Sequence, residues 1–341
     1  MKDIAVVLLN WNGVKLLEQF LPSITAHSTK ASIYVIDNAS TDHSVTFIEE
    51  NYPQITVIKL NKNHGFCGGY NLGLTQIQAK YYVLVNTDIE VTENWLTDPV
   101  DILSSDPSVG VCQPKIKSWR EKDKFEYAGA AGGYIDYLGY PFCRGRIFEN
   151  IEEDHHQYDD TSEIFWASGA CFFIKASLFH DSGGFDSHFF AHMEEIDLCW
   201  RIKNSGFKII YCGSSTVYHV GGATLVKDNP KKTYLNFRNS LLCLVKNLPP
   251  KKYIPKVVAR LILDGAAGLY FLYKKQPLHT LAILKAHLAF YRKMWKYTYS
   301  VKSYTTSPIY KKSIVVEHHL RGKKKTSELK SLEIPNYIPI S

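Results

Sequence analysis

Residues 4–17 read IAVVLLNWNGVKLL, and this stretch decides the fold class. The apolar run at its start has the length of a buried strand, whereas the apolar residues after Gly13 recur at helical spacing. The alternation returns three times in the first hundred residues, with strands expected at 33–36, 54–60 and 81–85. Strands that alternate with helices predict βαβ units and a parallel, doubly wound sheet, whose ligand lies at the carboxyl ends of the strands.

Polar side chains follow each of the four expected strands. Alone, any such cluster is ordinary loop chemistry, since Asn, Asp, Ser and Gly end strands and cap helices throughout proteins. Four clusters at four strand ends would converge on one crevice, however, and together they predict a ligand site. The clusters are Asn10-Trp11-Asn12, Asp37-Asn38-Ala39-Ser40-Thr41-Asp42, Asn63-His64-Gly65-Phe66 and Asn86-Thr87-Asp88.

If this chain binds a nucleotide, a cation would be needed to neutralise the charge of the phosphate groups. Neither GxGxxG nor GxxxxGK[ST] occurs, so the common dinucleotide and Walker phosphate loops are absent from the sequence. Asn86 and Asp88 present oxygen donors two residues apart, which can hold a hard divalent ion that bridges a diphosphate.

A second acidic group, Glu194, Glu195 and Asp197, stands at the start of an expected helix. Close carboxylates raise one another's pKa, which suits a general base. The alternative is a solvated helix N-terminus paired with Arg201, where acidic residues are favourable. His219 follows a strand-like run, and as an isolated residue it is expected to be a hydrogen-bonded loop histidine.

Charge is distributed unevenly along the 341 residues, whose net charge is +7. Residues 1–201 hold 28 Asp and Glu against 15 Lys and Arg, whereas residues 202–341 hold 5 against 25. The basic half predicts contact with an anionic surface. Nucleic acid is not expected as a partner, because no nucleic-acid-binding module is recognised. The seven cysteines form no CxxC pair, and the N-terminus has no secretory signature, so we expect a reducing cytosol.

The sequence predicts three segments: a catalytic domain over 1–240, a basic amphipathic helical extension over 241–320 and a flexible tail over 321–341. The longest uncharged apolar stretch in the extension, residues 265–273, is too short to cross a bilayer. Apolar residues at helical spacing among many lysines favour interfacial membrane binding. Helices packed on the catalytic domain with a solvated basic face remain the alternative.

Eight motifs occur in the order found in the family 2 glycosyltransferases. Their order over residues 3–240 is similar to the rhamnosyltransferase-like branch, which builds bacterial surface polysaccharides. The motifs are VVLLNWNG, VIDNASTD, NHGFCGGYNLG, VLVNTDIEV, ASGACFFIK, GGFDSHFF, MEEIDLCWR and VYHVGG. The resemblance implies an α/β fold of the GT-A type, with a Rossmann-like, mostly parallel central sheet flanked by helices and, in this chain, a C-terminal basic helical extension.

The resemblance also assigns roles to residues of the site. Asp88, with His219, would hold Mg²⁺ or Mn²⁺, and Asn86 stands where the family has the first acid of its D-x-D motif. Glu195 would be the general base, with Glu194 and Asp197 as substitutes. The sugar would lie near Trp166, Ser168, Gly169 and Arg201. The donor nucleotide would be bound by Asn10, Asn12, Asp37, Asn38, Asp42, Gly65, Asn71, Asn86 and Thr87.

The function implied is transfer of a sugar, with rhamnose as a candidate, from a nucleotide-diphosphate donor to a lipid-linked or growing glycan acceptor. Inversion in a single displacement, at the inner face of the cell membrane, is expected. The segment 125–148, with Arg144 and Arg146, resembles the acceptor loops of this branch. Two alternatives stay open: a catalytically silent GT-A-like protein that binds the membrane, and a sugar nucleotidyltransferase. Turnover of a nucleotide sugar distinguishes the first, and pyrophosphate release would reveal the second.

Overall fold

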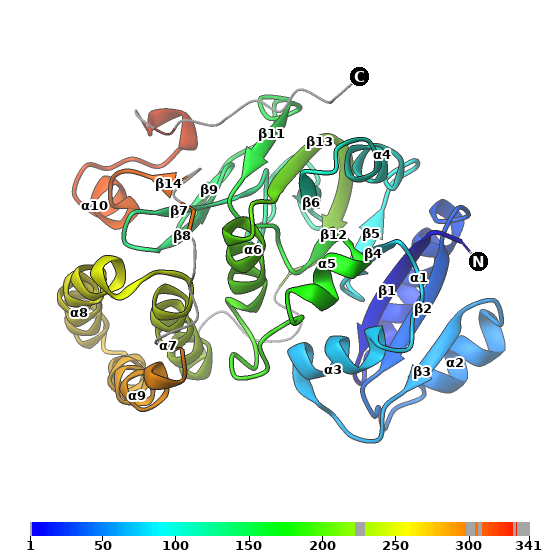
Figure 1. Cartoon of the computed structure of the whole chain (residues 1–341), viewed down its shortest axis with the longest axis horizontal. Helices are drawn as coiled ribbons and strands as arrows, with labels where there is room; N and C mark the ends of the chain where they lie inside the picture. Colours follow the sequence, from blue (N-terminus) through cyan, green and yellow to red (C-terminus); the bar gives the residue numbers. More distant parts are fainter. Residues whose placement is uncertain (1, 222–228, 298–303, 306–308, 330–331, 333–341) are drawn as a thin grey trace.

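The chain folds around a central sheet of nine strands (Figure 1). The computed structural model describes residues 2–221, 229–297, 304–305, 309–329 and 332. The strands follow the order β11 (Thr161–Ile164), β13 (Lys208–His219), β6 (Val109–Ser118), β12 (Cys171–Lys175), β4 (Tyr81–Val85), β1 (Ile4–Asn10), β2 (Ser32–Asp37) and β3 (Thr56–Lys59), with β5 (Ile89–Val91) beside β13.

The four strands expected from the sequence form the parallel half of this sheet. β1 lies between β2 and β4 and runs parallel to both, and β3 continues the parallel set beside β2. The other half is mixed, because β12 runs antiparallel between β4 and β6. The predicted α/β fold with a central sheet and flanking helices is confirmed, although the sheet is less uniformly parallel than expected.

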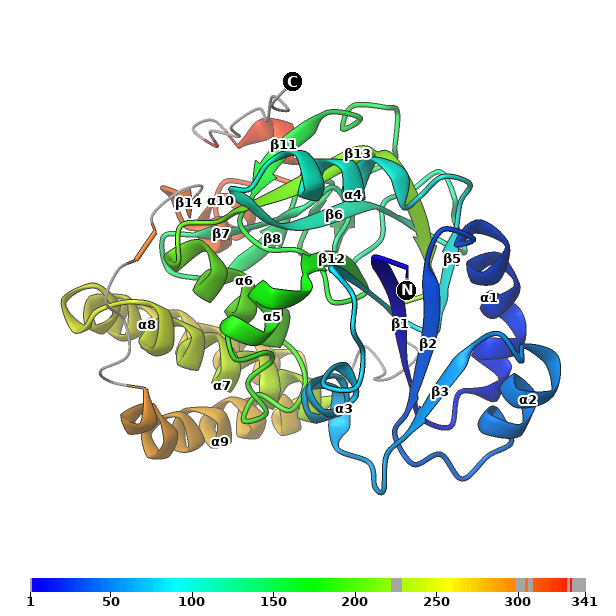
Figure 2. The same cartoon turned by 45° about the vertical axis from the view of Figure 1, so that its right-hand side comes forward.

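Helices bury both faces of the sheet (Figures 1 and 2). One core takes in α1 (Val14–His27), α2 (Ser44–Asn51) and α4 (Thr97–Ser105), and the other takes in α3 (Gly65–Leu74), α5 (Ala176–Asp181) and α6 (Glu194–Asn204). Val6 and Leu8 of β1 belong to the first core, whereas Ala5 and Val7 belong to the second. Burial on both faces explains why β1 is a continuous apolar run and does not alternate with polar residues.

A second, smaller sheet lies against the first. Its order is β10 (Asn150–Ile151), β9 (Arg146–Ile147), β8 (Pro141–Cys143), β7 (Gly133–Asp136) and β14 (Ile309–Tyr310). After β14 the chain forms α10 (Ile314–His319) and the short 3₁₀ helix η2 (Thr326–Glu328). Thr326 and Leu329 are buried, and the Thr326 N–H donates to Glu152 at 2.9 Å. This part of the expected tail therefore packs on the catalytic domain, while most of residues 330–341 lie outside the described residues.

Three long helices form a separate layer beside α6, visible together in both cartoons (Figures 1 and 2). They are α7 (Pro230–Asn247), α8 (Pro250–Tyr273) and α9 (Pro277–Lys293), followed by the 3₁₀ helix η1 (Met294–Lys296). The domain boundary expected at residue 240 falls inside α7, whose side chains from Leu241 to Val245 belong to a core of the catalytic domain. Among the helices that the structure describes, none is both long and apolar enough to cross a membrane.

Candidate active site

A polar group of side chains, here called the strand-end group, lies where β1 and β2 end. Their register sets Asn10 opposite Asp37, and the Asn10 Nδ2 donates to Asp37 at 3.4 Å and to Ser40 at 3.1 Å. The Asn10 Oδ1 is buried and has no hydrogen-bond partner among the described residues. A Cβ at Gly13 would lie 2.5 Å from that oxygen, so glycine leaves it clear. A buried acceptor without a donor suits a ligand that brings an N–H or O–H group.

Asn12 and Asp42 hold the loops around the strand-end group together. Asn12 has a φ of 51°, and its Oδ1 accepts from the Thr41 N–H at 2.7 Å. The Asp42 Oδ2 accepts from the Val14 N–H at 3.0 Å, at the start of α1. Burial would raise the pKa of Asp42, but hydrogen bonds from the Ser44 side chain and the backbone keep that pKa below its usual value. Both residues therefore act on loop geometry in this structure.

Asn38 and Asn71 also join neighbouring segments by hydrogen bonds. The Asn38 side chain accepts from the His64 N–H at 2.9 Å and donates to the Gly65 carbonyl at 3.0 Å. Asn71 bonds both the N–H and the carbonyl of Phe185, at 2.9 and 2.7 Å. Asn38 thus joins the loop after β2 to the start of α3 at Gly65, whereas Asn71 joins α3 to the loop before α6.

Asp88 and His219 meet beside the end of β4, as expected for a metal pair. The His219 Nε2 lies 3.1 Å from the Asp88 Oδ1, and its Nδ1 lies 3.3 Å from the Glu126 Oε2. The Val220 N–H also donates to the Asp88 carbonyl at 3.1 Å. Burial would lower the pKa of His219, but the carboxylates of Glu126 and Asp88 raise it to about 10. In this arrangement a protonated imidazole neutralises two buried acids.

The chemistry of this cluster suits a divalent cation. A carboxylate oxygen and an imidazole nitrogen are ligands that Mn²⁺ accepts, and a histidine ligates a metal in its neutral form. A cation at Asp88 and His219 would thus replace the proton that His219 holds. No group of three His, Cys, Asp or Glu side chains in the described ranges is arranged to hold a metal alone.

A strained loop presents the second acidic group. Phe190, His192 and Met193 have φ values of 68°, 67° and 73°, in the left-handed region that non-glycine residues seldom adopt. Met193 is the N-cap of α6, so Glu194 and Glu195 occupy its first turn. Such strain persists only where surrounding contacts hold it, and it is frequent at functional sites.

Glu194 is buried and Glu195 is half-buried, and each has one buried carboxylate oxygen without a hydrogen-bond partner among the described residues. Within the described part of the chain, the Oε2 atoms of Glu194 and Glu195 and the Nε2 of His192 have no hydrogen-bond partner. Burial raises the pKa of Glu195 to about 7, although backbone N–H groups lower it in part. Burial and the charge of Glu195 raise the pKa of Glu194 well above its usual value. Burial lowers the pKa of His192 to about 4. Glu195 thus has the pKa of a general base that works near neutral pH.

Contacts across Gly169 join this glutamate to the strand-end loop. A Cβ at Gly169 would lie 3.7 Å from the Glu195 Cβ. The next residue, Ala170, accepts from the Asn86 N–H at 2.9 Å, and Asn86 begins the Asn-Thr-Asp turn that ends at Asp88. A Cβ at Gly13 would lie 4.0 Å from the Thr87 Oγ1, so this turn also lies close to the loop after β1. Gly169 therefore lies beside Glu195, and the Asn-Thr-Asp turn lies beside Ala170 and Gly13.

Trp166 and Ser168 form the packed support beneath Gly169. The Trp166 Nε1 donates to the Tyr134 carbonyl at 2.9 Å, and its ring fills the space that a Cβ at Gly133 would need. The Ser168 Oγ donates to the Ala128 carbonyl, and its N–H donates to Gln113 at 2.7 Å. Both residues are buried in structural contacts, so Gly169 is the member of this group that reaches the site.

Asp197 and Arg201 are occupied by ion pairs on the other side of α6. Asp197 is fully buried and contacts the Lys246 Nζ and the Arg201 Nε, each at 2.9 Å. Arg201 also donates to the carbonyls of Ser182 and Gly184. In this structure the two residues therefore join α6 to α7 and to the loop after α5, on a different side of the helix from Glu195.

Residues that the sequence analysis missed hold the strained loop. The Asn239 Nδ2 donates to the carbonyls of Phe189, Ala191 and His192 at 3.0, 3.0 and 2.7 Å. The neighbouring Arg238 donates to the Phe189 carbonyl at 3.0 Å. The available signal was a polar pair among apolar residues of a helix, which indicates a buried hydrogen-bonding role. Glu126 was also missed, because nothing nearby in the sequence announces its contact with His219.

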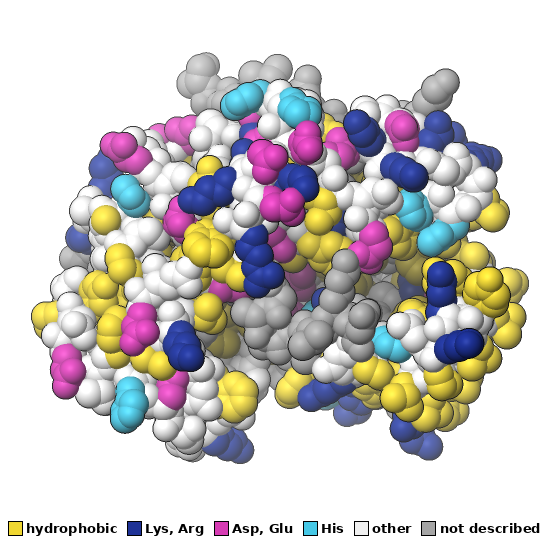
Figure 3. Space-filling model, turned by 180° about the vertical axis from the view of Figure 1, so that it is seen from behind, with side chains coloured by type: hydrophobic (Ala, Val, Ile, Leu, Met, Phe, Trp, Pro, Cys, Tyr) yellow, Lys and Arg dark blue, Asp and Glu magenta, His cyan; other side chains and the backbone are white. Residues whose placement is uncertain are grey.

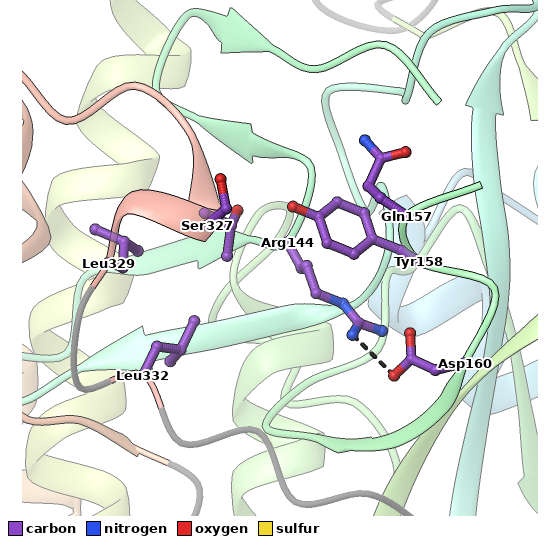
Figure 4. A pocket seen from close by; sticks show the side chains of 8 residues that line it. Arg144, Gln157, Tyr158, Asp160, Ser327, Leu329 and Leu332 are labelled. Atoms are coloured by element: carbon purple, nitrogen blue, oxygen red, sulfur yellow. Dashed lines mark hydrogen bonds and ion pairs between the residues drawn. The ribbon is translucent and has the colours of Figure 1, made fainter. Parts of the chain in front are cut away.

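Arg144 lies away from the site, in a hollow covered by the C-terminal segment. Figure 4 shows its guanidinium directed at Asp160, beside Tyr158 and below Ser327 and Leu329. The Nη1 contacts Asp160 at 2.9 Å, and the group stacks on Tyr158 with its carbon 4.9 Å from the ring centre. The N–H groups of Arg144 thus donate to neighbouring residues of the fold. Arg146 stacks on Tyr127, with its guanidinium carbon 4.2 Å from the ring centre.

Solved structures place this architecture in the GT-A class of glycosyltransferases. GalNAc-T7 with UDP, GalNAc and Mn²⁺ aligns with a TM-score of 0.56 and 15% identity, covering 72% of this chain and 48% of that chain. This chain thus spans about half the length of GalNAc-T7. The mannosyltransferase PcManGT from Pyrobaculum calidifontis, in complex with GDP-Man and Mn²⁺, aligns with a TM-score of 0.53 and 17% identity, covering 85% and 87%.

Sequence comparison then identifies the family: the chain belongs to glycosyl transferase family 2, whose model matches residues 5–183. It is 25% identical over 233 residues to N-acetylglucosaminyl-diphospho-decaprenol L-rhamnosyltransferase of Mycobacterium tuberculosis, covering 63% of this chain and 75% of the relative. It is 23% identical over 246 residues to the low-salt glycan biosynthesis hexosyltransferase Agl10 of Haloferax volcanii, covering 70% and 75%. The family predicted from the motifs is confirmed.

Proposed function

We propose that the chain is an inverting glycosyltransferase that transfers a sugar from a nucleotide-diphosphate donor to a hydroxyl of a lipid-linked or growing glycan. The observation that carries this proposal is Glu195, which lies beside Gly169 with a buried, unpartnered carboxylate oxygen and whose pKa burial raises to about 7. The relative from Mycobacterium tuberculosis, named as an L-rhamnosyltransferase, supports rhamnose as the sugar.

The donor would bind along the ends of the parallel strands. Asn10 and Asp37 would contact the nucleoside, with the free Asn10 Oδ1 accepting from it. Asp88 and His219 would hold Mg²⁺ or Mn²⁺, which when bound stabilises the negative charge of the departing diphosphate as a Lewis acid. Two solved relatives in complex with Mn²⁺ support this assignment.

Glu195 would act on the acceptor. Its carboxylate takes the proton of the acceptor hydroxyl while the oxygen forms a bond to the anomeric carbon. The bond between that carbon and the diphosphate oxygen breaks in the same displacement, so the nucleoside diphosphate leaves and the configuration inverts. A general base contributes about 10²- to 10⁴-fold to such a rate.

A lipid-linked acceptor would require the enzyme to work beside a membrane. The name of the Mycobacterium tuberculosis relative specifies a diphospho-decaprenol acceptor. The basic half of this chain supports peripheral binding to the anionic inner face of the cell membrane.

A thermal-shift and turnover screen tests the proposal. The full chain is incubated with dTDP- and UDP-sugars, with and without Mn²⁺, and release of the nucleoside diphosphate is measured with an acceptor present. We expect one donor to raise the Tm in a Mn²⁺-dependent manner, since a ligand at 100 times its Kd adds about 2.7 kcal/mol. A donor that binds without any turnover would instead indicate a catalytically silent protein.

A further inference from the structure

Apolar side chains face outward along the whole length of α8. Ile254, Val258, Ile262, Leu269 and Tyr273 are exposed, at the spacing of one helix face, and Ile262 and Leu269 are 72% and 70% exposed. The opposite face of α8 is anchored on α7, where the Arg260 guanidinium donates to the Ser240 Oγ at 2.7 Å. The fold therefore turns the apolar stripe outward, although a helix on a protein surface normally exposes its polar face.

The neighbouring helix α9 repeats this pattern. Leu278, Leu281, Leu284 and Leu288 are exposed, and the stripe ends at Trp295, which is 72% exposed. Of the 21 large hydrophobic side chains exposed in the described ranges, 14 lie between residues 254 and 295, so the exposure is concentrated in one patch. Figure 3 shows hydrophobic side chains gathered over this corner of the molecule, with Lys and Arg at its margin. Concentrated exposure of this kind marks an interaction surface.

The charge of α8 and α9 indicates what kind of partner their exposed surface fits. Residues 250–297 contain ten Lys and Arg and one acid, Asp264, which is buried and paired with Arg260 and His287. The exposed surface of α8 and α9 is therefore apolar with a purely basic margin. In a symmetric dimer through this face, lysines would meet lysines, with no acid on either side. An anionic bilayer offers both hydrocarbon for the stripes and negative charge for the margin.

We propose that α8, α9 and η1 form a membrane-binding surface that lies flat in the interface of an anionic bilayer. The stripes enter the boundary between head groups and acyl chains, and the lysines contact the head groups. Tyr273 and Trp295 take the interfacial position that aromatic side chains prefer. This inference deepens the proposed function, on which it rests for the biological need, because it names the surface and mode by which the enzyme would reach a lipid-linked acceptor.

Flotation with vesicles tests the inference on the full chain. Wild type is mixed with phosphatidylglycerol/phosphatidylcholine vesicles or with phosphatidylcholine alone, at 0.1 and 0.5 M NaCl. We expect binding to the anionic vesicles that weakens at high salt without vanishing, because apolar insertion is not screened. Ile262→Glu/Leu269→Glu should lower partitioning more than about tenfold at both salt concentrations, since burying each apolar side chain contributes a factor of that order.

Leu320→Glu is the matched control, because Leu320 is 80% exposed but lies at the end of α10. It should bind vesicles as wild type does. Three outcomes would overturn the inference: no flotation of wild type, equal flotation of the double variant, or light scattering that shows a wild-type dimer which the double variant converts to monomer. Donor-induced Tm shifts and turnover with a short-chain acceptor should be unchanged in the double variant, so failure of the membrane surface and failure of the transfer activity are distinguishable.

Discussion

The side-chain amide of Asn239 donates to the carbonyl oxygen of His192 at 2.7 Å, across 47 residues of sequence. His192 has a φ of 67° and lies three residues before Glu195. A residue of the C-terminal helices therefore sets the backbone conformation that presents the candidate base.

Replacing Asn239 should lower catalysis more than binding. We expect Asn239→Ala to reduce kcat at least about tenfold while KM for the donor changes little, because the loop before Glu195 loses its restraint. Asn229→Ala is the matched control: it removes the N-cap of the same helix, where Asn229 accepts from the Lys231 N–H at 2.8 Å. The control should lose about 1 kcal/mol of stability and keep kcat. Equal loss of kcat in both variants would reduce Asn239 to a structural residue.

Glu195→Gln should abolish transfer and leave donor binding intact. The amide keeps the shape of the side chain but cannot accept the acceptor's proton, so we expect a loss of about 10²- to 10⁴-fold in kcat. Donor binding is followed by the Tm shift with Mn²⁺. Wild-type turnover in this variant would shift the role to Glu194.

The pH dependence of rate and stability should share one cause. Burial raises the pKa of Glu195 to about 7, so transfer should increase with pH and level off above that value. Between about pH 4.5 and 7, Glu195 is protonated in the folded state but ionised in the unfolded state. The free energy of unfolding therefore falls as the pH rises through this window. Glu195→Gln removes the part of this loss that comes from Glu195, so its Tm advantage over wild type should grow from pH 5 to pH 7.5. A Tm difference that stays constant with pH would contradict the assignment.

Asp88 and Asn86 should differ in their response to Mn²⁺. Asp88→Ala should weaken Mn²⁺-dependent binding of the nucleoside diphosphate and lower the rate, because a carboxylate oxygen binds a hard cation better than any neutral group left there. Asn86→Asp should be tolerated or should strengthen Mn²⁺ binding. Both effects are measured by Mn²⁺ titration in the presence of the diphosphate, and an unchanged midpoint in Asp88→Ala would remove the metal assignment.

Asp197→Asn should destabilise the fold. The buried carboxylate holds Lys246 and Arg201, and breaking such a cluster typically costs about 3 kcal/mol. Asp3→Asn, which breaks the exposed contact with Lys80, should cost less than about 1 kcal/mol. Urea unfolding measures both changes. An Asp197→Asn variant as stable as wild type but without transfer activity would return Asp197 to the catalytic candidates.

The parallel half of the fold, with the polar clusters that follow its strands, could be predicted from the sequence. The apolar run of β1 and the polar clusters after the strands are readable because each is a short segment with one environment. The contact between His219 and Glu126 joins residues 93 positions apart, and Lys246 reaches Asp197 across 49, so neither is encoded in a motif. The left-handed conformations of Phe190 and His192 also escape sequence reading, because distant hydrogen bonds impose them against local preference.

α7 contacts the loop before Glu195 through Asn239, and it contacts α8, which bears one of the apolar stripes, through Ser240. Because these contacts are direct, the distance from the bilayer plane to Glu195 would be set by helix packing and not by a linker. The enzyme would then select acceptors by the distance of their hydroxyl from the bilayer surface. A hydroxyl would be glycosylated when its carrier lipid and diphosphate hold it at the same distance from the bilayer as Glu195. Acceptors that carry the same sugar on a shorter or longer segment above the lipid would be distinguished by this distance, before the sugar ring contacts the enzyme.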